Sequence, residues 1–501
     1  MEPEHLDVLV VGAGLSGIGA ACHLGMRRPG SRVAVLEARG SLGGTWDLFR
    51  FPGVRSDSDM YTLGYGFRPW PQAKAIADGP SILAYIGDTA REYGVDRQIR
   101  FHHRVVAAGF SSETARWTVE VERTDVDAGT EALTLTCDFL YVCSGYYRYD
   151  EGYTPQFPGT ERFGGDIVHP QHWPEDLDHT DRRVVVIGSG ATAVTLVPEL
   201  ARTAAHVTML QRSPSYVVSL PSEDAFAELA RRWLPGSVVV PLVRWKNVLL
   251  QMVGFQLSRR APRLMASLLR KGVQAELPEG YDVDTHFAPR YEPWDQRLCV
   301  APDGDLFASI RDGRASMVTD GIETFTDTGV ALSSGRHLDA DIVVTATGLN
   351  LLAIGGIELS VDGHDIDVAS TVTYKGMMLS GVPNFALAFG YTNASWTLKC
   401  DLVSEYVCRL LAYMERHDHQ ICLPLAPASP ERRPLIDLAA GYVRRGEHLM
   451  PKQGPRPPWR LHQNYPRDLV SFRHRRLRDA GIRFGRARST GRVMRPETAR
   501  G

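Results

Sequence analysis

The chain has 501 residues and a formal net charge of -2 at pH 7, with 44% hydrophobic and 23% charged residues. These values exclude a fibrous or disordered protein and predict two or three domains with ample core. The balanced charge gives no reason to expect a nucleic-acid partner. The 7 cysteines are scattered with no CxxC pair, which is typical of reduced thiols rather than of disulfides or a zinc site.

The N-terminal stretch MEPEHLDVLVVGAG carries Glu2 and Glu4, has no basic segment and enters a strand almost at once. It therefore does not resemble a signal peptide. No uninterrupted apolar run reaches the roughly 20 residues that a membrane-spanning helix needs. We expect a cytoplasmic protein.

The first chemical motif follows directly, because LDVLVVGAGLSGIGAACHL predicts a buried strand, a glycine turn and a helix. Gly12, Gly14 and Gly17 form a GxGxxG pattern, which lets backbone N–H groups approach a pyrophosphate. Glu37 ends the next strand, VAVLEARG, where an acid accepts hydrogen bonds from a ribose diol and repels a 2′-phosphate. This half is predicted to bind FAD or NAD rather than NADP.

A second strand–turn–helix unit, RRVVVIGSGATAVTLVPEL, repeats the pattern later in the chain. Its following strand, HVTMLQRSP, ends in Gln211 and Arg212 instead of an acid, and arginine suits a 2′-phosphate. We therefore expect NADPH in this half and FAD in the first, with hydride passing from nicotinamide to flavin. The residues predicted to contact NADP are Gly188, Ser189, Gly190, Ala191, Thr192, Ala193, Gln211 and Arg212.

The duplicated unit predicts an α/β fold of two Rossmann-like dinucleotide-binding domains, one for FAD and one for NADPH, with a helical insertion in the second. We expect the FAD-binding domain to be discontinuous, over 1–145 and 346–501, with a linker over 146–160. The NADPH-binding domain is expected over 161–220 and 281–345, interrupted by the helical insertion over 221–280. The Pro- and Arg-rich tail from Pro451 is expected to wrap or fray, with nucleic-acid binding there a remote alternative.

The predicted insertion alternates apolar and basic residues at helical spacing, as in WKNVLLQMVGFQLSRR and PRLMASLLRKG. We expect these helices to pack on the sheet with their arginines in solvent. The alternative is a peripheral membrane contact through a basic amphipathic face.

Between the two nucleotide motifs, FGGDIVHPQHWP fits the pattern FxGxxxHxxxWP. His169 and His172 could suggest a metal pair, but no cluster of Cys or His nearby offers the remaining ligands. We expect no metal, and we expect the segment to join the two domains. Its fixed positions are Phe163, Gly165, His169, Trp173 and Pro174.

This motif is the fingerprint of Baeyer–Villiger monooxygenases, and the chain resembles that branch of the class B flavin monooxygenases. GGTWDLFRFPGVRSDSDMY, CSGYYRYDEGY, PWDQRLC, TATGLN and GYTNASWTLK extend the resemblance over nearly the whole chain. The resemblance implies that NADPH reduces FAD and that O₂ then gives a C4a-peroxyflavin. This species would convert a small hydrophobic ketone to an ester or lactone, and the same machinery could S-oxidise thioethers or thioamides.

The resemblance also implies roles for single residues. Arg297 corresponds to a catalytic arginine, and Asp57 corresponds to the acid that pairs with it and orients it. Several relatives have Lys before that arginine where this chain has Gln296, so NADPH preference would depend mainly on Arg212. The residues implied to contact FAD are Ser16, Thr45, Trp46, Asp57 and Val105, with Arg55 and Ser56 at the nicotinamide end of NADP.

Two alternatives stay open at this point. One is a flavin monooxygenase that acts mainly on sulfur or nitrogen. The other is an NADPH-dependent electron-transfer flavoprotein reductase, against which the Trp-Pro ending of the motif and the Asp57–Arg297 pairing argue, because such a reductase needs neither.

Overall fold

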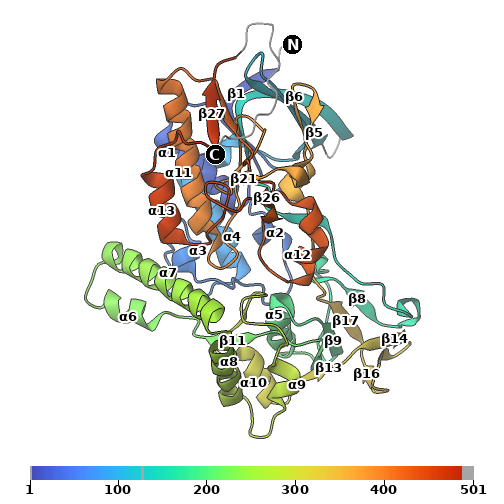
Figure 1. Cartoon of the computed structure of the whole chain (residues 1–501). Coiled ribbons are helices and arrows are strands. Elements are labelled where there is room, and N and C mark those ends of the chain that lie inside the picture. Colours follow the sequence, from blue (N-terminus) through green and yellow to red (C-terminus); the bar gives the residue numbers. More distant parts are fainter. Residues whose placement is uncertain (1–2, 126–128, 488–501) are drawn as a thin grey trace.

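The structure of the chain is a computed structural model that describes residues 3–125 and 129–487. Figure 1 shows an upper lobe that contains β1 and β27, the first and last described strands, and a lower lobe built from the middle of the chain. A helical arm projects sideways near the level where the two lobes meet. The expected FAD-binding domain over 1–145 and 346–501 and the expected NADPH-binding domain over 161–220 and 281–345 stay predictions, made for the upper and the lower lobe respectively.

The upper lobe is built on a 9-stranded sheet in the order β20-β19-β4-β5-β6-β1-β2-β3, with β23 also paired to β6. The strands β23, β6, β1, β2 and β3 are mutually parallel, as a dinucleotide-binding sheet requires, whereas β4, β5 and β6 form an antiparallel meander. The strand bounds are β1 (Glu4–Val11), β2 (Val33–Leu36), β3 (Ile99–Arg100), β4 (His103–Ser111), β5 (Arg116–Asp125), β6 (Gly129–Val142), β19 (Glu358–Val361), β20 (His364–Asp365) and β23 (Phe385–Leu387).

The lower lobe contains a 5-stranded, fully parallel sheet in the order β13-β10-β9-β17-β8. Its strands are apolar runs such as RVVVI, typical of parallel strands covered on both faces. The bounds are β8 (Asp166–Val168), β9 (Arg183–Ile187), β10 (His206–Gln211), β13 (Ala315–Thr319) and β17 (Ile342–Thr345). A small antiparallel sheet lies beside it, formed by β14 (Ile322–Thr326), β15 (Gly329–Leu332) and β16 (His337–Asp339).

Helices cover both sheets. Those of the upper lobe are α1 (Leu15–Arg27), α2 (Thr45–Leu48), α3 (Met60–Leu63), α4 (Gly79–Glu92), α11 (Trp396–Arg416), α12 (Gly441–Gly446) and α13 (Tyr465–Arg473). Those of the lower lobe and its insertion are α5 (Ala191–Leu200), α6 (Ala225–Arg231), α7 (Gly236–Arg260), α8 (Pro262–Glu276), α9 (Val283–Phe287) and α10 (Asp305–Arg311). Short two-stranded ladders pair β21 (Thr373–Tyr374) with β22 (Met378–Leu379), β24 (Ile421–Pro424) with β27 (Ile482–Gly485), and β25 (Arg433–Pro434) with β26 (Lys452–Gln453). Single 3₁₀ turns are η1 (Val95–Gln98), η2 (Thr160–Arg162), η3 (Pro170–His172), η4 (Ala353–Gly356), η5 (Val368–Ser370) and η6 (Glu447–Leu449).

The tail from Pro451 is ordered as far as the described residues extend, because it supplies β26, α13 and β27 to the upper lobe. Of the two expected states, wrapped or frayed, the tail is therefore wrapped up to residue 487. The final part of RARSTGRVMRPETARG lies outside the described residues.

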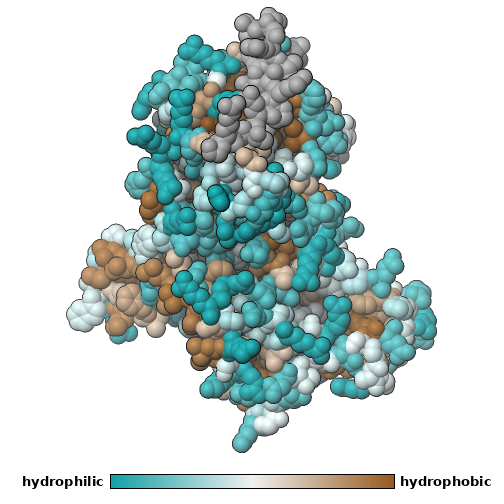
Figure 2. All heavy atoms as spheres, viewed as in Figure 1, coloured by the Kyte–Doolittle hydropathy of each residue, from teal (hydrophilic) through white to brown (hydrophobic). Residues whose placement is uncertain are grey.

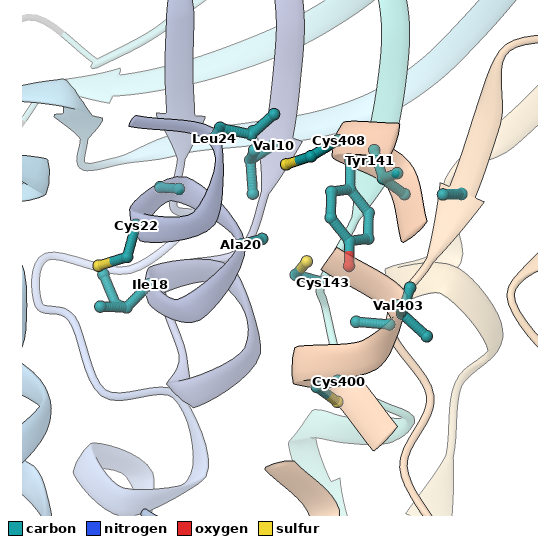
Figure 3. Packing of buried hydrophobic residues seen from close by; sticks show 14 of the residues in the cluster. Val10, Ile18, Ala20, Cys22, Leu24, Tyr141, Cys143, Cys400, Val403 and Cys408 are labelled. Atoms are coloured by element: carbon teal, nitrogen blue, oxygen red, sulfur yellow. The ribbon is translucent and has the colours of Figure 1, made fainter. Parts of the chain in front are cut away.

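The core of the upper lobe lies between α1 and α11. Figure 3 shows Cys143 and Tyr141 between α1 and α11, with Cys400 and Val403 on α11 and with Ile18 and Cys22 on the far side of α1. All 7 cysteines are buried free thiols, and burial raises the pKa of Cys22 and Cys400 to about 12. None of these cysteines forms a disulfide in the part of the chain that the structure describes.

The two lobes are connected by two passes of the chain that pair with each other. β7 (Tyr147–Gly152) leads out of the upper lobe and β18 (Leu349–Leu351) leads back, and they form an antiparallel ladder. Part of the segment expected to be a linker, 146–160, thus forms one strand of a two-stranded ribbon.

The insertion leaves the lower lobe after β11 (Val217–Leu220) and returns at β12 (Cys299–Pro302), and these two strands pair in parallel. The long helix α7 does not pack on a sheet: it lies against α3 of the upper lobe. The expectation that the helices pack on the sheet with solvated arginines is therefore wrong for α7. Part of its basic and polar face is used to attach it to the upper lobe, and its apolar face is exposed.

Candidate active site

The first glycine turn has the geometry of a pyrophosphate site. Gly12 has φ +100°, and a Cβ there would lie 2.8 Å from the carbonyl oxygen of Cys143. A Cβ on Gly17 would lie 1.8 Å from the carbonyl oxygen of Gly12, so α1 approaches β1 as only glycine permits. The turn therefore presents the N-terminus of a 13-residue helix, which favours negative charge.

Glu37 lies beside this turn, because its carboxylate accepts a hydrogen bond from the backbone N–H of Ala13 at 2.8 Å. Its other oxygen accepts from the N–H of Arg39 at 3.0 Å. Burial raises the pKa of the Glu37 carboxyl, and these two donors oppose that rise. The carboxylate therefore lies next to the glycine turn, where a ribose diol would compete for its oxygens.

Of the other residues implied to contact FAD, the structure brings Ser16 and Thr45 to the same turn but not Val105. Gly43 and Gly44, which precede Thr45, lie beside the first glycine turn. The N–H of Gly43 donates to the carbonyl of Ala13 in that turn at 2.9 Å. Thr45 Oγ1 lies 3.3 Å from the Tyr149 hydroxyl, and Ser16 Oγ accepts from the indole N–H of Trp396 at 2.8 Å. Trp46 is half-buried against the core of this lobe. Val105 is buried in β4, in the cluster on the other face of the sheet.

The second glycine turn has a similar geometry with more open space. Gly188 has φ +141°, and a Cβ there would lie 2.2 Å from the carbonyl oxygen of Ala346. A Cβ on Gly190, by contrast, would meet nothing within 4 Å. Gly190 caps α5, which begins at Ala191, so the open space lies at a helix N-terminus and can accept a phosphate.

The remaining residues of this motif divide between surface and core. Ser189 Oγ lies 2.9 Å from Ser215 Oγ, Thr192 is half-buried on α5, and Ala193 is fully buried. Arg212 is exposed and forms no ion pair within residues 3–125 and 129–487. It is therefore available for a 2′-phosphate.

Gln211 has a different position from the one expected. Its side chain is buried, and its amide donates to the carbonyl of His286 at 2.8 Å and to Thr319 Oγ1 at 2.9 Å. The amide is thus occupied in joining β10 to β13 and α9. Its predicted contact with NADP, which stays a prediction, would therefore have to come from its backbone.

Arg297 and Asp57 meet where the two lobes join. The guanidinium Nη1 of Arg297 lies 3.3 Å from Oδ2 of Asp57, although the two residues are far apart in the sequence. The negative charge of Asp57 raises the pKa of Arg297, and burial of the guanidinium partly opposes this rise. The arginine therefore stays cationic. The side chains are 36% and 37% exposed, so both face open space at the junction. The pair offers a fixed positive charge with one side available to a ligand.

The loop that carries Arg297 is strained and is held by the inserted helix. Trp294 has φ +70°, a conformation that side-chain-bearing residues rarely adopt and that clusters at functional sites. Its indole packs edge-to-face on Phe255 of α7, with ring centroids 5.6 Å apart. Asp295 accepts from Arg259 of α7 at 2.9 Å. The C-terminal end of α7 therefore fixes the loop that positions Arg297.

Three tyrosines that sequence reasoning did not assign to the site surround the arginine. The hydroxyls of Tyr146 and Tyr147 lie 3.1 Å apart, and the ring centroid of Tyr442 lies 6.3 Å from that of Tyr147. Burial raises the pKa of all three phenols, so they stay protonated. The adjacent residues Tyr146 and Tyr147 in CSGYYRYDEGY were a signal in the sequence for two of them. Tyr442 lies in α12, at the far end of the chain, with no local motif.

Arg55 and Ser56 lie on the same loop as Asp57. Arg55 forms a two-contact ion pair with Asp305 at the start of α10, which crosses from the upper lobe to the lower lobe. Ser56 is buried, and its hydroxyl has no hydrogen-bond partner within the described part of the chain. An unsatisfied buried hydroxyl costs free energy unless a ligand pairs with it, which fits the expected nicotinamide contact.

The histidine of the fingerprint motif lies at the junction ribbon. His169 Nε2 donates to the carbonyl of Gly348 at 3.2 Å, and its Nδ1 accepts from the N–H of Gln171 at 3.1 Å. Both ring nitrogens are therefore engaged, and burial lowers the pKa of His169, which favours the neutral ring. The amide of Gln171 in turn donates to the carbonyls of Arg148 and Tyr149 in β7.

The other fingerprint positions have packing roles. Phe163 is buried edge-to-face on Phe325, and a Cβ on Gly165 would lie 2.2 Å from the carbonyl oxygen of Asp341. Trp173 packs against the core of the lower lobe, and Pro174 is exposed. The motif therefore joins the edge strand β8 to the ribbon between the lobes.

The sequence profile of flavin-binding monooxygenase-like proteins matches residues 75–361, and that of the NAD(P)-binding Rossmann-like domain matches residues 10–78. The chain is 56% identical over 485 residues to the FAD-containing monooxygenase EthA of Mycobacterium tuberculosis, covering 96% of this chain and 98% of that protein. It is 52% identical over 488 residues to EthA of Mycolicibacterium smegmatis, with 97% and 98% covered.

Solved structures show the same fold. An oxidized steroid monooxygenase bound to NADP aligns with a TM-score of 0.72 at 24% identity, covering 96% of this chain and all of that one. A cyclohexanone monooxygenase bound to cyclohexanone aligns with a TM-score of 0.68 at 21% identity, covering 85% and 90%.

Two dinucleotide folds with an arginine–carboxylate pair between them define a two-cofactor oxidoreductase. The chain belongs to the flavin-binding monooxygenase-like family, as an FAD-containing monooxygenase. The expected fold class, the two cofactors FAD and NADP, and the resemblance to this family are confirmed.

Proposed function

We propose that this monooxygenase uses NADPH and O₂ to convert ketones to esters or lactones, the Baeyer–Villiger reaction. The observation that carries the proposal is the contact of 3.3 Å between Arg297 and Asp57 at the junction of the lobes. Oxygen transfer to a carbonyl needs a permanent cation beside a developing oxygen anion, and arginine cannot lose its proton to such an anion. A ketone is also bound in one solved structure of this fold, the cyclohexanone monooxygenase.

The residues around the first glycine turn fit FAD. Gly12, Gly14 and Gly17 leave room for the pyrophosphate, and Glu37 would accept the ribose hydroxyls in place of its present backbone donor. Ser16 and Thr45 supply hydroxyls beside the turn. Bound FAD, once reduced, supplies the reaction with O₂ that places one oxygen atom in the product.

The residues of the lower lobe fit NADPH. The open N-terminus of α5 at Gly190 would hold the pyrophosphate, and Arg212 would hold the 2′-phosphate by charge-assisted hydrogen bonds. Ser56, whose buried hydroxyl is unpaired within residues 3–125 and 129–487, would pair with the nicotinamide end.

At the junction the chain's own groups perform positioning and charge stabilisation. Asp57 fixes the direction of the Arg297 guanidinium and keeps it charged. The phenols of Tyr146, Tyr147 and Tyr442 remain protonated and offer O–H donors on the other side. Together these groups favour an anionic oxygen over a neutral one.

The test is turnover of a methyl ketone with NADPH under ¹⁸O₂, followed by mass spectrometry of the product. We expect one labelled oxygen in an ester. Arg297→Ala should retain FAD and lose ester formation, whereas Arg290→Ala, an exposed arginine nearby in the chain, should form ester normally.

Two results would assign the enzyme differently. Sulfoxide from a thioether without any ester from ketones would make it a monooxygenase of sulfur. NADPH oxidation that reduces an added protein acceptor while no labelled oxygen enters any substrate would make it an electron-transfer reductase.

A further inference from the structure

The inserted helix α7 meets the protein with a mixed face, on which Val239, Val243 and Val248 are buried beside polar side chains. Among the polar ones, Arg244 donates to the carbonyls of Tyr61 and Gly64 at 2.9 and 2.8 Å. Asn247 and Gln251, one and two turns further on, both donate to the carboxylate of Asp59, at 2.9 and 3.0 Å. These bonds fix which face of α7 meets the upper lobe.

The opposite face of α7 is apolar and exposed. Val238, Leu242, Trp245, Leu249 and Val253 follow one another at intervals of three or four residues, so they form one stripe along the helix. Leu250 beside this stripe is 61% exposed. A helix with this pattern normally buries its apolar stripe in the core, so the exposed stripe needs another partner.

The exposed stripe extends onto the neighbouring helices. Phe226 and Leu229 of α6 are exposed, and Trp233 between α6 and α7 is 82% exposed. On α8, Leu264 and Leu268 are exposed at an interval of four residues. Figure 2 shows hydrophobic side chains gathered over the projecting arm at the left. We call the helices α6, α7 and α8 the docking arm. Contiguous apolar patches of this kind mark contacts with partner proteins or with lipid.

The charge of the docking arm selects between these partners. The arm, residues 225–276, contains nine arginines and lysines and two acids, Glu228 and Glu276. Arg232, Arg260 and Arg263 are exposed, and none forms an ion pair within the described residues. A second copy docked face to face would bring these cations together without carboxylates to neutralise them, whereas an anionic lipid surface would neutralise them.

We propose that the docking arm binds the enzyme to the surface of an anionic lipid membrane, with α7 lying in the plane of the interface. Its apolar stripe enters the acyl region, Trp233 and Trp245 lie at the headgroup level, and the arginines pair with lipid phosphates. The inference goes beyond the proposed reaction, because it requires only the arm.

The same helix is long and apolar enough to cross a membrane, so the expectation that no segment could do so needs correction on length and composition alone. Crossing would nevertheless break the bonds of Arg244, Asn247 and Gln251 to the upper lobe and expose these groups to hydrocarbon. An orientation in the membrane plane keeps every one of these bonds.

The test is co-sedimentation of the full-length enzyme with vesicles of phosphatidylcholine, with and without phosphatidylglycerol. We expect binding to the anionic vesicles that falls at least tenfold in Trp233→Asp, in Leu242→Glu and in the double variant Arg260→Gln/Arg263→Gln. Met26→Glu is the matched control, because Met26 is 43% exposed on α1, outside the arm, and Leu242 is 47% exposed. The control should bind vesicles as the unchanged enzyme does, and all variants should retain FAD content and NADPH oxidation in solution.

Three results would overturn the proposal. One is equal binding of the arm variants and the unchanged enzyme. Another is resistance of the bound enzyme to extraction by alkaline carbonate, which would indicate a spanning helix. The last is a lipid-free dimer that only the arm variants dissociate, seen by analytical ultracentrifugation without any vesicle binding, which would assign the arm to a second copy.

Discussion

Replacement of Asp57 by asparagine tests the role of the charge pair most directly. The change keeps the size of the side chain and removes the negative charge 3.3 Å from the Arg297 guanidinium. At an effective dielectric constant of about 20, two charges at that separation attract by about 5 kcal/mol. Because each side chain is more than a third exposed, solvent screening brings the contribution to stability toward about 1 kcal/mol.

The catalytic consequence should be larger than the effect on stability. A charge-assisted hydrogen bond that orients a catalytic group contributes about 1.5–3 kcal/mol, which corresponds to a fall of roughly ten- to hundredfold in product formation. We expect Asp57→Asn to retain FAD. Its flavin should lose absorbance at the rate of the unchanged enzyme when mixed rapidly with NADPH, but the variant should form less product for each NADPH consumed. The assay combines stopped-flow absorbance of the flavin with quantification of ester and hydrogen peroxide.

Glu175→Gln is the matched control for that substitution. Glu175 also lies 3.3 Å from an arginine, Arg50, and this contact also joins the two lobes, but both side chains are largely exposed. The control should leave product per NADPH unchanged. An equal fall in product per NADPH in both variants would show only that the lobes need ion pairs between them. An unchanged product per NADPH in Asp57→Asn would refute the orienting role of Asp57.

Three further predictions concern the cofactor lobes and their junction. Gly190→Ala should leave the melting temperature unchanged and raise KM for NADPH at least tenfold, because its Cβ meets no protein atom within 4 Å; Gly188→Ala, whose Cβ would lie 2.2 Å from a carbonyl oxygen, should instead lower the melting temperature. Arg212→Ala should reduce the ratio of kcat/KM for NADPH over NADH about tenfold or more, as expected for lost charge-assisted bonds, and an unchanged ratio would place the 2′-phosphate elsewhere. The folded state lowers the pKa of His169 below its ordinary value of 6.5, so its contribution to stability is present above that pH and is lost as pH falls below it. We therefore expect the melting temperature of His169→Ala, measured at several pH values, to lack the part of the decrease below that pH that is due to His169. The flavin content of the variant should stay constant.

The architecture of the two lobes was predictable because its signals are local. The glycines of both turns and the apolar strands beside them are short patterns that specify a strand, a turn and a helix. The contact of Arg297 with Asp57 was implied only by the family resemblance, because no spacing in the chain relates two residues so far apart. Tyr442 reaches the same site from α12, and no local pattern there indicates it.

The errors have equally physical causes. Periodicity does not show which face of α7 meets the protein. Here a mixed face with Val243, Asn247 and Gln251 does, and a second, apolar stripe is exposed. For Gln211, the missing acid at the end of its strand predicts an NADP site, but it does not show where each side chain points. Neighbouring residues of a strand point to opposite faces. Its amide therefore points toward β13, whereas Arg212 is exposed.

The order of elements in the upper lobe has a consequence for synthesis. β23 completes its parallel sheet, and Trp396 of α11 bonds to Ser16 across 380 positions in the sequence. On the ribosome the first glycine turn therefore emerges long before the elements that cover it. The lower lobe, whose sheet strands all lie within residues 166–345, can fold as a unit in the meantime. Stable loading of the flavin must wait for the last third of the chain, so the two cofactor sites mature in the reverse of their order in the sequence.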